Sequence, residues 1–244
     1  MIEEEIEIPT PDGKCDGVFW RPENRQHKPA VIMLTDIGGI RPANRDLAGR
    51  LASEGYAVLM PNLFYRTTKV PVFDFVPNFG EERTKKRMDE LRAPLTPDAI
   101  ERDAAAYVDF AAAHDASGAI GVAGYCFSGS IAMRIAAAQP DKIRVAASFH
   151  GGGLFNDAPT SPHLLLPRIK ARLYFGHAIE DRSMPAEAIE KFNSALKSWG
   201  GEYESEIYES AYHGWTMPDS PVYNQPQAER AYGKLKELLA QTLN

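Results

Sequence analysis

One short stretch, residues 120–129, constrains the fold of this chain more than any other part of the sequence. It reads Ile-Gly-Val-Ala-Gly-Tyr-Cys-Phe-Ser-Gly, an apolar run followed by a turn that carries one nucleophilic side chain, Cys126. Residues 130–139 continue as a predicted helix. Small residues at 124, 128 and 129 let a strand and a helix pack around a tight turn, so the pattern predicts a nucleophile elbow. The competing interpretation is a buried cysteine at a strand end, because free cysteine packs as a small apolar residue.

The remainder of the chain alternates between predicted strands and predicted helices. Apolar runs between turn signals predict strands over residues 3–8, 15–20, 29–35, 56–61, 144–150, 171–176 and 202–208. Helical patterns cover residues 43–55, 97–114, 184–199 and 227–243. This alternation predicts the α/β class, with a mostly parallel central sheet and helices on both faces. The first two strands are joined by a short turn and should form an antiparallel amino-terminal pair.

Residues 62–95 are the least regular part of the sequence. They contain three prolines and a basic cluster, and we expect a loop or small cap with a short helix over 81–92. A stretch this long between regular elements is often functional. The alternative for its basic cluster is a solvated helix face. Because the sequence has no internal repeat and no linker, we expect a single domain over residues 1–244.

Composition and charge argue against several classes of protein. The 244 residues are 44% hydrophobic and 25% charged, with a net charge of −6, so binding to nucleic acid or to an anionic membrane is not expected. No apolar run approaches the roughly 18 residues of a membrane span, and the acidic start is too polar for a signal peptide. Cys15 and Cys126 form no CxxC motif, which favours a reducing cytoplasm. We expect no metal and no cofactor, because no HExxH motif and no glycine-rich phosphate loop is present.

Acids and histidines at the ends of predicted strands are the candidate partners of Cys126, since active sites of open α/β sheets lie beyond the carboxyl ends of the strands. Asp181 follows the strand over 171–176, and His213 follows the last strand. In α/β-hydrolases the nucleophile, the acid and the histidine occur in this order along the chain. Glu180 competes with Asp181 for the role of the acid. His150 and His177, also at strand ends, compete with His213.

With these residues in place, the sequence resembles the dienelactone hydrolase family within the α/β-hydrolases. The similarity covers nearly the whole chain, and the cysteine within Gly124-Tyr-Cys126-Phe-Ser-Gly129 is its most specific part. Other matching segments are residues 34–39, 55–65, 176–181 and 211–213. The resemblance implies the α/β-hydrolase fold and a triad of Cys126, His213 and Asp181. It also implies hydrolysis of an ester or lactone through a thioester acyl-enzyme.

The resemblance assigns further roles. The backbone N–H groups of Ile37 and Phe127 are expected to form the oxyanion hole. Asp36 stands where the family has an acid, commonly glutamate, that contacts the nucleophile, but its side chain is one methylene shorter.

Two departures from the family pattern bear on the substrate. Characterised members bind the substrate carboxylate with arginines, one of them four residues after the histidine, where this chain has Met217. Trp215 and Met217 therefore predict an apolar wall beside His213. The second arginine lies in the region that matches residues 81–87, where the candidates are Arg83, Lys85 and Arg87.

We therefore expect a hydrolase that prefers neutral, fairly apolar esters or lactones to carboxylate-bearing dienelactones, because burying an unpaired carboxylate is costly. A monomer or weak homodimer is expected. One alternative is a redox-active cysteine protein, for which Cys15 would be a poor resolving partner. The other is a non-catalytic small-molecule-binding protein of the same fold, since a fold does not fix a function.

Overall fold

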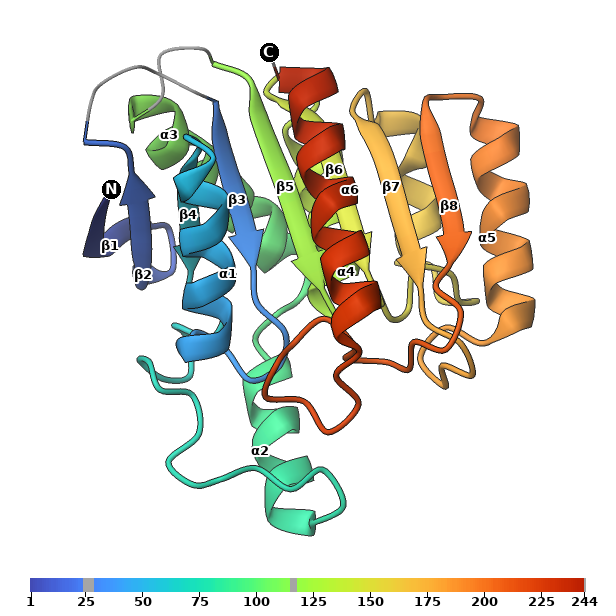
Figure 1. Ribbon diagram of the computed structural model, residues 1–244, viewed down its shortest axis with the longest axis horizontal. Helices are drawn as coiled ribbons and strands as arrows, with labels where there is room; N and C mark the ends of the chain where they lie inside the picture. The colour runs from blue at the N-terminus through green and yellow to red at the C-terminus, as the bar shows by residue number, and fades with distance from the viewer. Residues whose placement is uncertain (24–28, 115–117, 244) are drawn as a thin grey trace.

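A computed structural model of the chain describes residues 1–23, 29–114 and 118–243 (Figure 1). Its elements follow one another as strands, helices and one 3-10 helix, η1. In chain order they are β1 (Ile2–Thr10), β2 (Gly13–Arg21), β3 (Ala30–Leu34), α1 (Pro42–Ser53), β4 (Ala57–Pro61), α2 (Glu82–Arg92), α3 (Pro97–His114), β5 (Ile120–Tyr125), α4 (Ser128–Ala138), β6 (Ile143–Phe149), η1 (Pro162–Arg168), β7 (Arg172–His177), α5 (Ala186–Trp199), β8 (Tyr203–Ile207) and α6 (Gln225–Leu243).

The strands form one sheet in the order β1-β2-β4-β3-β5-β6-β7-β8. Strand β2 pairs antiparallel with β1 and β4, and the other neighbours pair parallel. The predicted α/β class and the antiparallel amino-terminal pair are therefore confirmed. The predicted helix over 130–139 begins earlier, at Ser128, because the helix starts directly after the turn that holds Cys126. The single-domain organisation stays a prediction.

Helices cover both faces of the sheet, with α1 and α6 on one face and α3, α4 and α5 on the other (Figure 1). Strand β3 is an example of a strand that is covered by helices on both faces and is apolar at every position. Val31 and Met33 pack in the core cluster with α1 and α6, whereas Ile32 and Leu34 pack in the cluster with α3 and α4. Successive side chains of a strand point to opposite faces, so a strand covered on both faces must be apolar at every position.

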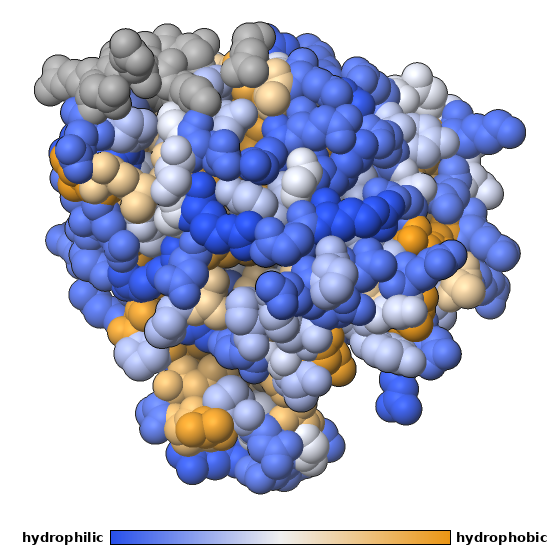
Figure 2. Space-filling model, viewed as in Figure 1, coloured by the Kyte–Doolittle hydropathy of each residue, from blue (hydrophilic) through white to orange (hydrophobic). Residues whose placement is uncertain are grey.

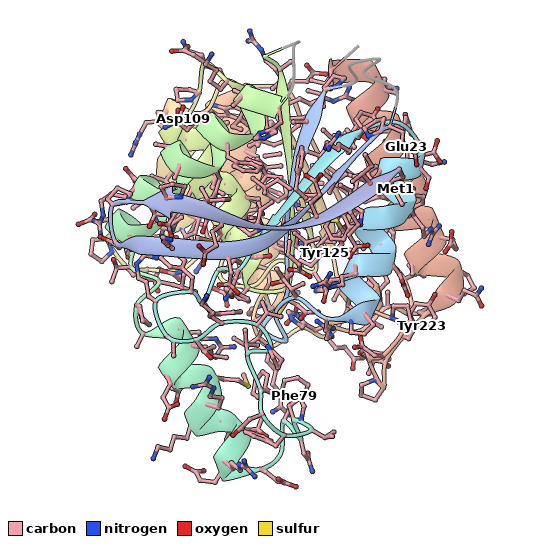
Figure 3. The ribbon with its side chains drawn as sticks, turned by 90° about the vertical axis from the view of Figure 1, so that its left-hand side faces the viewer. Met1, Glu23, Phe79, Asp109, Tyr125 and Tyr223 are labelled. Carbon is pink, nitrogen blue, oxygen red and sulfur yellow. The ribbon has the colours of Figure 1, made fainter. Side chains whose placement is uncertain are left out.

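Residues 62–95 project beyond the carboxyl ends of the strands and include α2, which confirms the predicted short helix (Figure 1). Figure 2 shows apolar surface on this projection. The side chains of Val76 and Phe79, two residues of the projection, are exposed. Phe79 is labelled in Figure 3. Two members of its basic cluster make contacts within the projection. Arg83 lies 3.8 Å above the Phe75 ring, and Arg87 donates to the carbonyl of Val72 at 3.0 Å.

Within the described ranges, no helix is both long enough and apolar enough to cross a membrane.

Candidate active site

Cys126 occupies the turn between β5 and α4, with a backbone φ of 60°. A Cβ atom added to Gly124 would lie 2.2 Å from the carbonyl oxygen of Ser128, so only glycine fits where the strand and the helix meet. Ser128 stands where the elbow motif usually has glycine. Its buried hydroxyl accepts the N–H of Tyr125 at 2.8 Å and lies 2.8 Å from the Tyr125 carbonyl oxygen, so this serine ties the turn together.

We expect Gly124→Ala to destabilise the protein and to lower its activity, because the added methyl group would meet backbone atoms that have no room to move. Overpacking of this kind typically costs 1–3 kcal/mol, so about that loss in the free energy of unfolding is expected from urea denaturation. Gly233→Ala is the matched control. Gly233 is exposed in α6, and a Cβ atom added there would have no neighbouring atom within 4 Å. Alanine at this position should stabilise the protein by up to about 1 kcal/mol. An unchanged Gly124→Ala variant would contradict this account of the elbow.

The carboxyl ends of β5, β7 and β8 bring Cys126, Asp181 and His213 together. The Nε2 atom of His213 lies 3.1 Å from the Cys126 Sγ, and its Nδ1 atom lies 2.7 Å from Asp181 Oδ2. The other oxygen of Asp181 accepts the N–H and the hydroxyl of Ser183, at 2.8 and 2.6 Å. Asp181 is therefore held from both sides, and it fixes the orientation of the His213 ring.

The charges in this group stabilise one another. Burial by itself would lower the pKa of His213, but the hydrogen bonds and charges of Asp181 and Cys126 outweigh burial and raise it to about 10. Burial by itself would raise the pKa of Asp181, but its hydrogen bonds with His213 and Ser183 lower it. The site thus favours a charged imidazolium next to a carboxylate.

Two of the residues that competed for these roles, Glu180 and His177, do not join Cys126 and His213. Glu180 is exposed, and no hydrogen bond joins it to His213 within the described part of the chain. His177 is buried and contacts the hydroxyl of Ser205 at 3.1 Å. Burial lowers the pKa of His177 to about 4, so this ring is neutral at pH 7.

His150 lies next to Cys126 and His213, although the sequence suggested it only as a competitor of His213. Its Nδ1 atom accepts the N–H of Cys126 at 3.0 Å, and its Nε2 atom is 2.8 Å from the hydroxyl oxygen of Thr216. The His150 ring packs at a steep angle against His213 and Trp215, with centroids 5.1 and 4.9 Å apart. Its position directly after β6 was the signal in the sequence.

Backbone strain gathers at this edge of the sheet. Within the described residues, the non-glycine residues with positive φ are Cys126, His150, Glu180 and Ser210. Each follows the carboxyl end of a different strand, from β5 to β8. Residues held in sparsely populated backbone conformations cluster at functional sites, because the surrounding structure must stabilise them.

The backbone N–H groups of Ile37 and Phe127 are available to a ligand. Within the described part of the chain, neither donates a hydrogen bond to a protein acceptor, whereas the neighbouring Gly38 and Gly39 N–H groups do. Phe127 directly follows Cys126, and Ile37 lies in the loop after β3, the strand that pairs with β5. This arrangement suits an oxyanion hole.

Asp36 does not make the contact with the nucleophile that the family resemblance implied. Its carboxylate binds the guanidinium of Arg41 through two hydrogen bonds of 2.6 and 2.9 Å, and no hydrogen bond links it to Cys126 among the described residues. Arg41 also binds Asp219, at 2.6 and 3.0 Å. The guanidinium of Arg41, five residues further along the chain, thus binds the short Asp36 side chain with both of its terminal nitrogens.

The predicted apolar wall is part of the protein core. Trp215 and Met217 are 0% and 1% exposed, so they offer almost no surface to a substrate. Trp215 stacks on Tyr208, and the Met217 sulfur accepts a hydrogen bond from Asn44. Both side chains belong to the core cluster that also includes residues of α1 and α6. The expectation that they line the substrate pocket is therefore corrected.

The basic residues of α2 remain candidates for contact with a substrate. In the structure, Arg83 and Arg87 bind other parts of the projection, and Lys85 is exposed. Among the residues that the structure describes, no three His, Cys, Asp or Glu side chains gather in a group that could hold a metal ion.

A model of the dienelactone hydrolase family matches residues 15–243. The chain belongs to the dienelactone hydrolase family. The predicted resemblance is confirmed, and the protein is a hydrolase that acts on a lactone or an ester. Its oligomeric state and cytoplasmic location stay predictions.

Individual relatives match most of the chain. A protein of Synechocystis sp. named "Putative carboxymethylenebutenolidase" is 28% identical over 240 residues, which span 96% of this chain and 94% of that protein. A carboxymethylenebutenolidase of Rhodococcus opacus is 29% identical over 196 residues, 78% of this chain and 73% of that protein. The crystal structure titled "Putative Dienelactone Hydrolase" from Klebsiella pneumoniae has a TM-score of 0.87 at 23% identity and covers 98% of both chains, which shows that the fold is shared.

Proposed function

We propose that this protein hydrolyses a small carboxylic ester or lactone with a Cys126–His213–Asp181 triad, through a thioester acyl-enzyme. One observation carries the proposal: His213 lies within hydrogen-bond distance of both the Cys126 sulfur and the Asp181 carboxylate, at 3.1 and 2.7 Å. A nucleophile, a base and a group that orients the base are the components that covalent acyl transfer needs.

In the acylation half-reaction, the Cys126 thiolate attacks the substrate carbonyl carbon and the carbonyl oxygen becomes an oxyanion. The N–H groups of Ile37 and Phe127 donate to this oxyanion. The oxyanion then re-forms the carbonyl and breaks the bond to the leaving oxygen, which takes the Nε2 proton of His213. With a lactone, the released alcohol stays attached to the acyl group.

In the deacylation half-reaction, neutral His213 takes a proton from a water molecule, and the resulting hydroxide attacks the thioester carbonyl. The second oxyanion uses the same two N–H donors. Its collapse breaks the carbon–sulfur bond and releases the acid, and Cys126 returns as a thiolate beside the His213 imidazolium. Asp181 stabilises this imidazolium through the hydrogen bond to Nδ1, so each proton transfer starts from a fixed ring orientation.

The acyl-enzyme gives a direct test. We expect an acid quench during turnover of p-nitrophenyl acetate to trap one acetyl group on the peptide that contains Cys126, detected by mass spectrometry. The peptide with Cys15 serves as an internal control and should stay unmodified, because Cys15 is buried and burial raises its pKa to about 12. The proposal would be refuted if the trapped acetyl group were found on another residue. It would also be refuted if a burst of p-nitrophenol appeared and no acetyl group were found on the Cys126 peptide.

The buried state of Cys15 also bears on the redox alternative. A redox cycle usually needs a second thiol that can reach the oxidised one. Cys15 is fully buried in β2, where its sulfur contacts the carbonyl of Asn62 and the hydroxyl of Tyr107. It is therefore a poor resolving cysteine, and the hydrolase proposal is favoured.

We expect neutral esters to be better substrates than matched esters that carry a carboxylate, by about tenfold in kcat/KM, which corresponds to about 1.4 kcal/mol. Arg41, and not the buried Met217, is the residue that we expect to set this preference. Arg41 belongs to the loop that follows Ile37, and Asp36 and Asp219 already bind it, so this side of the site holds an excess of negative charge.

The measurement compares one neutral ester with one anionic ester of equal length. Asp219→Asn removes one carboxylate from Arg41 and should shift the preference toward the anion. Lys85→Ala removes a positive charge from the exposed face of α2 and should leave the preference as it is. A wild-type preference for the carboxylate that is lost in Lys85→Ala would instead show that α2 binds the substrate anion.

A further inference from the structure

We propose that His150 is a positioning residue, which holds the nucleophile turn and the ring of His213 in their reactive arrangement. The proposal deepens the proposed function and rests on it. His150 directly follows β6, and its side chain is 1% exposed. It therefore acts on the reaction only through the residues that it contacts.

The first contact is with the backbone of the nucleophile. The N–H of Cys126 points between two acceptors, the carbonyl of Phe149 at 3.1 Å and the Nδ1 atom of His150 at 3.0 Å. The peptide that enters Cys126 is thus fixed from two adjacent residues of the neighbouring strand. Because Cys126 has a φ of 60°, this peptide needs such support to stay in place. Its orientation sets the directions of the Cys126 Sγ and of the Phe127 N–H.

The second contact fixes the position of the ring proton. An Nδ1 atom that accepts a backbone N–H carries no proton, so the proton of a neutral ring lies on Nε2. This Nε2–H then donates to the hydroxyl oxygen of Thr216, 2.8 Å away. Thr216 belongs to the loop that carries His213. One side chain thereby connects the nucleophile turn, the end of β6 and the histidine loop.

The third contact is with the base. The rings of His150 and His213 meet at 64° with centroids 5.1 Å apart. A charged His150 ring would lose its acceptor atom and face the His213 imidazolium. Burial, followed by the charge of His213, holds the pKa of His150 well below its usual range, while Asp181 acts in the opposite direction. His150 stays neutral while His213 gains and loses its proton.

Two substitutions at this position separate the acceptor from the shape of the ring. His150→Phe keeps a ring but has no acceptor atom. His150→Asn offers an oxygen acceptor and tolerates the φ of 41° at this position. We expect His150→Phe to lower kcat by about 100-fold with little change in KM, the size of effect seen when reacting groups are slightly misplaced. His150→Asn should recover most of this loss.

Thr216→Val is a milder variant, because it leaves the His150 ring in place. It tests the proposal even if His150→Phe does not fold. It should lower kcat by about tenfold, since the Nε2 proton loses its acceptor. Nitrogen NMR of the wild type should show His150 protonated on Nε2 alone. Nδ1 protonation, or a kcat in either His150→Phe or Thr216→Val that stays within about twofold of the wild type, would overturn the proposal. Trapping the acyl group on Cys126 in the wild type tests the proposed function separately from these outcomes.

Discussion

Replacing Cys126 by alanine should abolish ester hydrolysis. The thiolate is the only atom of the proposed triad that bonds to the substrate, and its removal leaves His213 and Asp181 without a nucleophile to activate. Removal of the nucleophile from a comparable serine triad lowers kcat on the order of 10⁶-fold. We therefore expect no hydrolysis of p-nitrophenyl acetate above background in steady-state assays. Iodoacetamide should inactivate the wild type in step with alkylation of Cys126.

Cys15→Ala is the matched control, because it removes the other thiol of the chain. Cys15 lies in β2 and makes contacts only within the core, so the variant should keep its kcat and lose some stability, about 1 kcal/mol. The assignment of the nucleophile would be wrong if Cys126→Ala kept more than a trace of activity, or if Cys15→Ala lost its activity.

Asp181→Asn should lower kcat by about 10⁴-fold, the effect of the same change in a serine protease triad. The amide can donate to Nδ1 of His213 and so favours the wrong tautomer. The pKa of His213 should also fall from about 10 toward its ordinary value, because the charge of Asp181 helps to raise it. Glu180→Gln removes a neighbouring but exposed carboxylate and should leave kcat close to that of the wild type.

The same substitution predicts a change in stability with pH. Since the pKa of His213 is higher in the folded protein than in the unfolded chain, its protonation stabilises the fold below a pH of about 6.5, and this contribution is lost as the pH rises toward about 10. The difference in unfolding free energy between wild type and Asp181→Asn should thus be larger at a pH of about 6 than at about 10. Equal differences at both pH values, or a large loss of kcat in Glu180→Gln, would move the triad acid away from Asp181.

Local patterns in the sequence were enough to predict the elbow and the alternation of strands and helices along the chain. The small residues at 124, 128 and 129 leave room for a strand and a helix to meet at a tight turn. A Cβ atom added at Gly124 would lie 2.2 Å from the carbonyl oxygen of Ser128, so a larger residue would not fit there. The continuous apolar strands required helices on both faces. The order of Cys126, Asp181 and His213 along the chain was informative because parallel strands bring their carboxyl ends to one edge, where the three residues lie together.

Only the tertiary structure decided which way individual side chains point and what they bind. The sequence placed Asp36 and Met217 near the site, but Asp36 binds Arg41 and Met217 is buried against Asn44. Both contacts depend on the paths of the loops that carry Asp36 and Met217. The spacing of hydrophobic residues along the sequence does not predict these paths. The choice between Asp181 and Glu180, and the contact of His150 with Cys126, depend on backbone angles at strand ends. These angles are set by long-range packing, because isolated residues rarely adopt positive φ unless their surroundings hold them there.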